Sequence, residues 1–185
     1  MPDGVVSVPE CSGWNYLNLS VDDLYAAEEM ALNAGAPASV AYPSANLGLY
    51  IPLYVSAPGL AQGLFWQNGT AVAGNVEVAI YDEDGNKLAS SGVVAAAGVN
   101  APQYVAFVSP VLLVTGRYYI AVMATSGSQQ FLAWTTSAAA TNVNRMFGIV
   151  EQAAVGGGLP AVWTPVTSAR SYLPLVGVSF ALVAI

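Results

Sequence analysis

The residues whose types best fit chemistry are three successive acids, Asp82, Glu83 and Asp84. Carboxylates can hold a calcium ion, exchange protons with a substrate, or simply lie in a turn. Together with Asn86, the two aspartates have the alternating spacing of calcium ligands, but the glycine and the distal glutamate of an EF-hand loop are not in place. Asp84-Gly85 is typical of a hairpin turn, because aspartate favours turns and glycine tolerates positive φ. The pattern therefore favours a turn over a calcium site, and we predict no metal site.

The rest of the composition restricts catalysis. The chain has no histidine and a single cysteine, Cys11, so histidine-dependent serine or thiol chemistry and the usual zinc sites lack a required residue. A glycosidase needs two carboxylates on either side of a sugar, and nothing singles out a pair among Glu77, Glu151 and the cluster at 82–84. No glycine-rich phosphate loop precedes a helix. We predict that the protein is not an enzyme and that it uses no cofactor.

The charge balance argues against nucleic acid and membrane partners. The formal net charge is −7, and the basic residues lie far apart in the sequence, at Lys87, Arg117, Arg145 and Arg170. Binding to phosphates requires clusters of such residues, so we expect no nucleic-acid partner. No run of residues reaches the ~18 consecutive apolar positions of a membrane helix, so we also expect no membrane insertion.

The low charge content points to a subunit that is covered by neighbours. Hydrophobic residues make up 55% of the chain and charged residues 8%, whereas an ordinary soluble domain has ~25% charged residues. Obligate interfaces are poor in charge and rich in apolar side chains. We therefore expect a homo-oligomer or a copy fixed among other proteins.

Most of the chain is patterned as short β-strands. Residues 75–82 alternate, with Val76, Val78 and Ile80 on one face, which predicts a half-buried strand. GGGLP at 156–160 indicates a loop. Further strands are expected at 47–56, 103–108, 117–124, 129–135, 145–151, 163–166 and in the C-terminal run 171–185. This pattern predicts an all-β fold, an antiparallel β-sandwich of jelly-roll-like or related Greek-key type, over residues 41–185.

Residues 1–40 differ from the rest and are expected to form an arm with one short helix. The helix is predicted at 21–33, where Ser20 provides a cap and Gly35 and Pro37 end it. The arm could serve as an attachment segment, or residues 14–19 could form the first strand of the sandwich.

Aromatic residues are the remaining candidates for ligand binding. Exposed tryptophan and tyrosine rings stack on sugars or anchor protein partners, although most aromatics of a β-sandwich pack in its core. Trp66 and Trp163 are the best candidates for ligand contacts, because both lie next to loop sequences.

Four segments of the sequence carry a recurring pattern: the aromatic-proline strand Tyr50-Ile51-Pro52, the hairpin Ile80 to Gly85 followed by Ser91-Gly92, the strand Gly116 to Ala121, and the closing run Pro174 to Gly177. With this pattern the sequence resembles small β-sandwich virion proteins of tailed bacteriophages. The resemblance covers about residues 44–178. Proteins of this kind are described as tail-fibre, minor tail or head-decoration proteins.

The resemblance implies a place on the virion and a mode of action. It implies a non-enzymatic structural protein on the particle exterior, assembled in the bacterial host, whose partners are other virion proteins and copies of itself, with a trimer favoured. The alternative is a carbohydrate-binding β-sandwich module that recognises host cell-surface glycans, and the tip of a fibre could combine both roles.

Overall fold

The computed structural model describes residues 37–135, 148–153, 155–168, 170 and 172–181. These residues form strands, turns and loops but no helix, so none of them forms a span suited to crossing a membrane as a helix. The strands are β1 Ala38–Ala41, β2 Leu47–Val55, β3 Gly59–Gln67, β4 Asn75–Asp82, β5 Lys87–Ser90, β6 Val94–Ala95, β7 Pro102–Leu113, β8 Gly116–Ala124, β9 Gln130–Thr135, β10 Val150–Gln152, β11 Val166–Thr167, β12 Tyr172–Pro174 and β13 Val176–Ala181. The expected all-β class is confirmed, and the helix expected at 21–33 lies outside the described residues.

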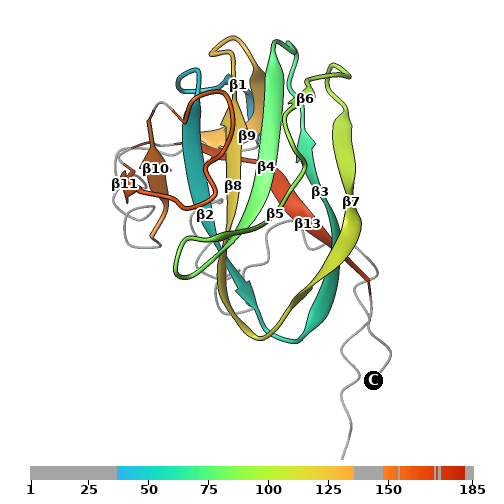
Figure 1. Ribbon diagram of the computed structural model, residues 1–185. Helices are drawn as coiled ribbons and strands as arrows, with labels where there is room; N and C mark the ends of the chain where they lie inside the picture. The colour runs from blue at the N-terminus through green and yellow to red at the C-terminus, as the bar shows by residue number, and fades with distance from the viewer. Residues whose placement is uncertain (1–36, 136–147, 154, 169, 171, 182–185) are drawn as a thin grey trace, which may run out of the picture.

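The strands form one large sheet and two small ones. The large sheet has the order β11-β10-β2-β8-β4-β5, with β6 also paired to β4. The small sheets have the orders β13-β3-β7 and β1-β9-β12, and every pairing is antiparallel. Figure 1 shows β2, β8 and β4 side by side at the centre of the large sheet, with β3 and β7 beside it. The arrangement is that of an antiparallel β-sandwich.

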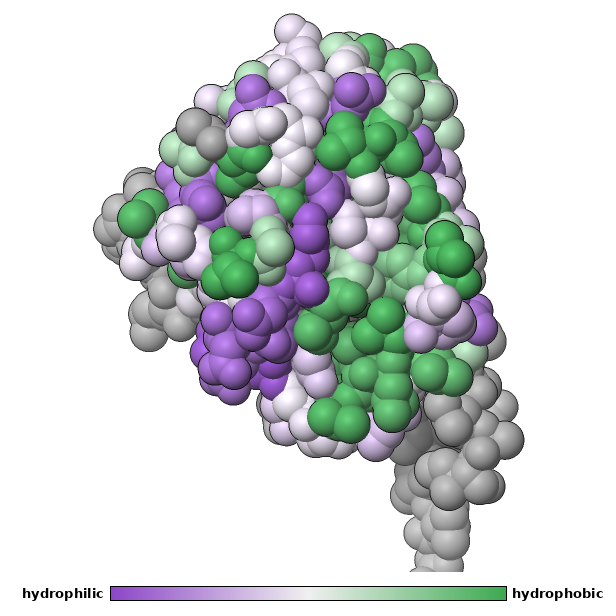
Figure 2. Space-filling model, in the orientation of Figure 1, coloured by the Kyte–Doolittle hydropathy of each residue, from purple (hydrophilic) through white to green (hydrophobic). Residues whose placement is uncertain are grey.

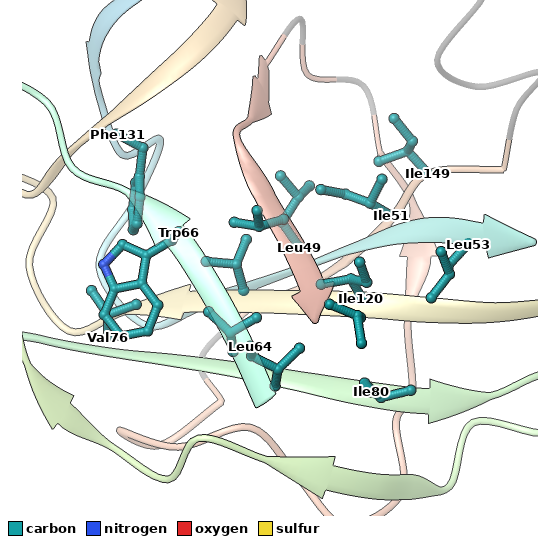
Figure 3. Packing of buried hydrophobic residues seen from close by; sticks show 14 of the residues in the cluster. Leu49, Ile51, Leu53, Leu64, Trp66, Val76, Ile80, Ile120, Phe131 and Ile149 are labelled. Carbon is teal, nitrogen blue, oxygen red and sulfur yellow. The ribbon is translucent and has the colours of Figure 1, made fainter. Parts of the chain in front are cut away.

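Alternate residues of the central strands point into one core. On β2, Leu49, Ile51 and Leu53 face inwards, and on β8 Ile120 does the same, where they meet Leu64 of the small sheet. Figure 3 shows these side chains packed between the two sheets. Each buried side chain of this size contributes about 1.5–3 kcal/mol relative to an exposed one, so this core accounts for much of the driving force for folding.

The strand β4 corrects one expectation from the sequence. Residues 75–82 form β4 as predicted, and Val76, Val78 and Ile80 face the core. The opposite face is not exposed, however, because Glu77 and Tyr81 are also buried. The prediction of a half-buried strand is therefore wrong, since a segment from much later in the chain covers the outer face of the large sheet.

The boundary between arm and sandwich is marked by β1. This strand pairs with β9 along its whole length, from Ala38↔Ala133 to Ala41↔Gln130. The hydrogen-bonded sandwich thus already includes residues 38–40, next to the position 41 at which the sandwich is expected to begin.

Candidate functional site

The outer face of the large sheet carries a cluster of aromatic rings. Tyr50, Tyr81 and Tyr119 come from the adjacent strands β2, β4 and β8, where they alternate with the core-facing residues. Trp163 reaches this face from the segment between β10 and β11. Its ring centroid lies 4.5 Å from that of Tyr119, 4.9 Å from that of Tyr50 and 6.0 Å from that of Tyr81. The indole is half-buried, so one part of it is packed on the sheet and another part remains accessible.

Residues 158–163, which we call the covering segment, are bound through their backbone. The Leu159 N–H donates to Oε2 of Glu77 over 2.6 Å, and the Leu159 carbonyl accepts a bond from Lys87 Nζ, also over 2.6 Å. Lys87 and Glu77 form an ion pair of 3.2 Å, and Ser90 donates its hydroxyl to the same carboxylate over 2.5 Å. Glu77 therefore uses its oxygens to hold the segment, and this bonding leaves it unsuited to act as a free catalytic carboxylate.

The far end of the covering segment pairs with the turn after β4. The Lys87 N–H donates to the carbonyl of Ala161 over 2.8 Å, and the Trp163 N–H donates to the carbonyl of Gly85 over 3.0 Å. The Tyr81 hydroxyl donates to the carbonyl of Pro160. These bonds hold the GGGLP loop predicted at 156–160 against the sheet, with Leu159 buried at 4% exposure.

The acid cluster forms a turn, as the sequence predicted. Oδ1 of Asp82 accepts a bond from the Asn86 N–H over 2.7 Å, and the Asp82 carbonyl accepts one from Gly85 over 3.1 Å. Gly85 has φ +86°, the left-handed conformation that favours glycine. Glu83 and Asp84 point to solvent. Within the described ranges, no group of three or more acidic, histidine or cysteine side chains is placed to hold a metal ion.

Burial raises the pKa values of two tyrosines of the cluster, Tyr50 and Tyr81. It raises the pKa of Tyr50 from 10.0 to about 12, and it raises the pKa of Tyr81 further still. Desolvation is the main cause in both cases, because the phenolate would lose its hydration. The rings of Tyr50 and Tyr81 are therefore uncharged at neutral pH.

Trp66 lies elsewhere. Its side chain is fully buried in the core, and its Nε1 donates to Oδ1 of Asn68 over 3.0 Å. Gln129 donates to the same oxygen over 2.9 Å, so the indole is fixed by a buried amide network. This position does not fit the ligand contact expected of Trp66. The structure does not bring the two candidate tryptophans together, and Trp163 is the one of the two that is accessible for a ligand contact.

A second surface feature is the side of the sandwich where the edge strands β5 and β7 contact each other, here called the open edge. The exposed apolar side chains of these two strands are Leu88 on β5 and Tyr104, Val108 and Leu112 on β7, with exposed fractions of 39%, 50%, 104% and 59%. Figure 2 shows hydrophobic residues gathered over this side of the molecule, next to the hydrophilic acidic turn. No residue of β7 is charged, and Lys87, the one charged residue of β5, is paired with Glu77, so the open edge presents a largely apolar surface.

Searches for similar proteins found no matching family model, no significantly similar curated protein and no significantly similar solved structure.

Proposed function

We propose that this protein is a non-enzymatic structural protein of a bacteriophage virion, located on the particle exterior as a tail-fibre, minor tail or capsid-decoration protein. It acts through protein–protein assembly, and its partners are copies of itself and other virion proteins. The proposal is supported by the resemblance of the four sequence segments, by the all-β sandwich and by the 8% content of charged residues.

The proposal includes a sandwich of the jelly-roll type. The hairpin β2–β3 and the hairpin β7–β8 run beside each other, because β2 pairs with β8 in the large sheet and β3 pairs with β7 in the small one. In Figure 1 both hairpins turn at the bottom of the molecule. Two paired hairpins that pass together from one sheet to the other are a feature of jelly rolls.

The open edge is the single observation that carries the assembly proposal. Its strand β7 has 12 residues and is therefore ~40 Å long. With two sheets ~10 Å apart and their side chains, the edge is roughly 15–20 Å wide and offers roughly 600–800 Å². A standard interface buries ~800 Å² on each partner. The size and apolar character of the open edge thus match those of a stable interface.

The occupant that we propose for the open edge is a second copy of the chain. β7 carries no charged side chain, and Lys87, the one charged residue of β5, is neutralised by its ion pair with Glu77. The edge therefore has little net charge that would repel an identical surface or select a different partner. A two-fold contact would bring two β7 strands together, whereas the trimer favoured by the resemblance would place three edges around one axis.

Light scattering on the purified chain at micromolar concentration tests this assembly. The protein should have the mass of an oligomer, and Val108→Glu with Leu112→Glu should reduce it to the mass of one chain. Val166→Glu is the matched control, because Val166 is 64% exposed on β11, away from the open edge. A wild-type monomer would overturn the assembly proposal, and so would equal dissociation in the control.

Mass spectrometry and antibody labelling of purified virions test the proposed location on the particle. Absence of the chain from the particle would overturn that location.

Glycan recognition is the second candidate function. It is favoured by Trp163, which is packed on Tyr119 and yet remains half-buried at the surface. The exposed fraction of Tyr54, 45%, adds a second accessible ring to this face. Binding on a glycan array that is lost in Tyr54→Ala would support this function, and an array without binding would exclude it.

A further inference from the structure

We infer that Arg117, together with Tyr54, Tyr119 and Trp163, forms a binding site for an acidic saccharide, a sugar ring that carries a carboxylate or a phosphate. This inference rests on glycan recognition, the second candidate function, and names its ligand class. Assembly through the open edge is independent of it.

The residues of the site are adjacent on the outer face of the large sheet. Arg117 and Tyr119 are two positions apart on β8 and therefore share a face. Tyr54 of β2 is the direct cross-strand partner of Arg117, and the Trp163 ring lies 4.5 Å from that of Tyr119. In this site the guanidinium of Arg117 lies between two accessible rings, those of Tyr54 and Trp163.

The guanidinium is held in place from two sides. The Cζ atom of Arg117 lies 5.2 Å from the centroid of the Tyr119 ring, a cation–π contact. Gly148, at φ +80°, lies against the other side, where an added Cβ would come within 2.5 Å of the Arg117 Nη2 atom. A guanidinium fixed in this way loses less conformational entropy when a ligand binds.

Arg117 also differs from the other described bases in its partners. Lys87 is paired with Glu77, and Arg170 with Glu151. Among the residues that the structure describes, Arg117 makes no ion pair or hydrogen bond through its guanidinium. An acidic residue, the exposed Glu83, is nevertheless close in the strand register, since it follows Asp82, the cross-strand partner of Tyr118. Within the described part of the chain no acceptor competes for the planar donors of Arg117, which are suited to bind an anion in a bidentate manner.

The combination of rings and guanidinium indicates the ligand class. The apolar face of a sugar ring packs on aromatic side chains, and its acidic group pairs with arginine. A nucleic acid does not fit, because its successive phosphates require several cations and the described surface here offers one unpaired base. A single acidic sugar needs only the one guanidinium.

Titration calorimetry on the full chain tests the inference with two probes that differ in their acidic groups, a trimer of galacturonic acid and a trimer of galactose. We expect the acidic trimer to bind and the neutral trimer to bind at least about tenfold more weakly. Arg117→Gln should weaken binding of the acidic trimer about tenfold or more, and Arg117→Lys should restore part of the affinity. Thermal unfolding confirms that the variants are folded. The phosphate form of the ligand is tested with galactose 6-phosphate, with inorganic phosphate as its control.

The outcomes separate the ligand class from the candidate function. Equal binding of both trimers, lost in Tyr54→Ala and unaffected by Arg117→Gln, would overturn the acidic-sugar inference and leave glycan recognition standing. No binding by any saccharide probe would overturn both. Binding of inorganic phosphate as strong as that of galactose 6-phosphate would show that the sugar ring is not recognised and would also overturn the inference.

Discussion

Gly85 is the residue at which the acidic turn and the covering segment depend on each other. Its φ is +86°, and a Cβ at this position would lie 1.5 Å from Nε1 of Trp163. Gly85→Ala therefore has to strain the turn and displace the indole, and we expect it to lower the free energy of unfolding by about 2–4 kcal/mol. Urea unfolding followed by circular dichroism measures the change.

Gly92 provides the matched control for this substitution. It also has positive φ, +66°, but a Cβ there would meet no atom within 4 Å. Gly92→Ala should cost only about 1 kcal/mol, the strain of the left-handed conformation. Equal losses in the two variants would mean that Trp163 is not packed on Gly85.

Individual residues differ in how far the sequence predicts their role. The turn at Asp84-Gly85 is a local property, and the sequence predicted it because both residue types favour that backbone shape. Trp66 and Trp163 both stand next to loops, and only the structure separates them. Trp66 lies two positions after Leu64 on β3 and therefore faces the core as Leu64 does. Alternation along β3 carries this signal, but the loop residues next to Trp66 obscure it in the sequence. Arg117 gave no signal, because its partners come from three separate segments.

At the scale of elements, the covering segment depends on Trp163 as its anchor. Trp163→Ala removes the contacts with three tyrosine rings, and we expect a loss of about 3 kcal/mol or more in the free energy of unfolding. Hydrogen exchange should become faster at Leu159 and Ala161 while the amides of β8 retain their protection, because the core is unchanged.

The neighbouring Val162 is the control for this variant. Its side chain is 58% exposed, so Val162→Ala should change stability by at most about 0.5 kcal/mol. Unchanged exchange at Leu159 in the Trp163→Ala variant would show that the Glu77–Lys87 pair holds the segment without the indole.

The same segment explains why the strand predictions were incomplete. Alternation in β4 predicted the strand and its core face correctly. It could not predict burial of the other face, because the covering segment follows more than 70 positions later and begins at the last of the three successive glycines 156–158, which indicate only a loop. Periodicity reports the shape of a segment, whereas burial of its second face depends on contacts between segments distant in sequence.

For the whole molecule, buried tyrosines predict loss of stability in alkali. Burial raises the pKa of Tyr50 to about 12, and it also raises the pKa values of Tyr42, Tyr81 and Tyr172 above 10.0. The unfolded chain releases these protons near pH 10 while the folded chain retains them. Stability from this source is therefore complete below pH 10 and falls as the pH rises towards 12, by ~1.4 kcal/mol per pH unit for each tyrosine.

Urea unfolding at a series of pH values between 8 and 11.5 measures this loss. In the Tyr50→Phe variant, the free energy of unfolding should fall less steeply above pH 10, by the contribution of one tyrosine, ~1.4 kcal/mol per pH unit. A free energy of unfolding that stays constant up to pH 11.5 would contradict the prediction.

Residues 1–36, the part of the expected arm 1–40 that precedes β1, contain six acidic residues and no base. If they serve as the attachment segment, a chain without them should stay folded and soluble and fail to join the virion. Circular dichroism and recovery in purified particles measure the two properties. Unfolding of the shortened chain would show that the arm is part of the core, and its incorporation into particles would show that attachment lies elsewhere.

The Glu77–Lys87 pair has a practical consequence for chemical labelling of the chain. Lys87 is the only lysine of the chain, and its amine is bound to Glu77 and to the Leu159 carbonyl. Dyes and cross-linkers that react with lysine amines therefore find no unpaired lysine on the chain. Labelling through lysine chemistry needs a lysine introduced at an exposed position such as Val166.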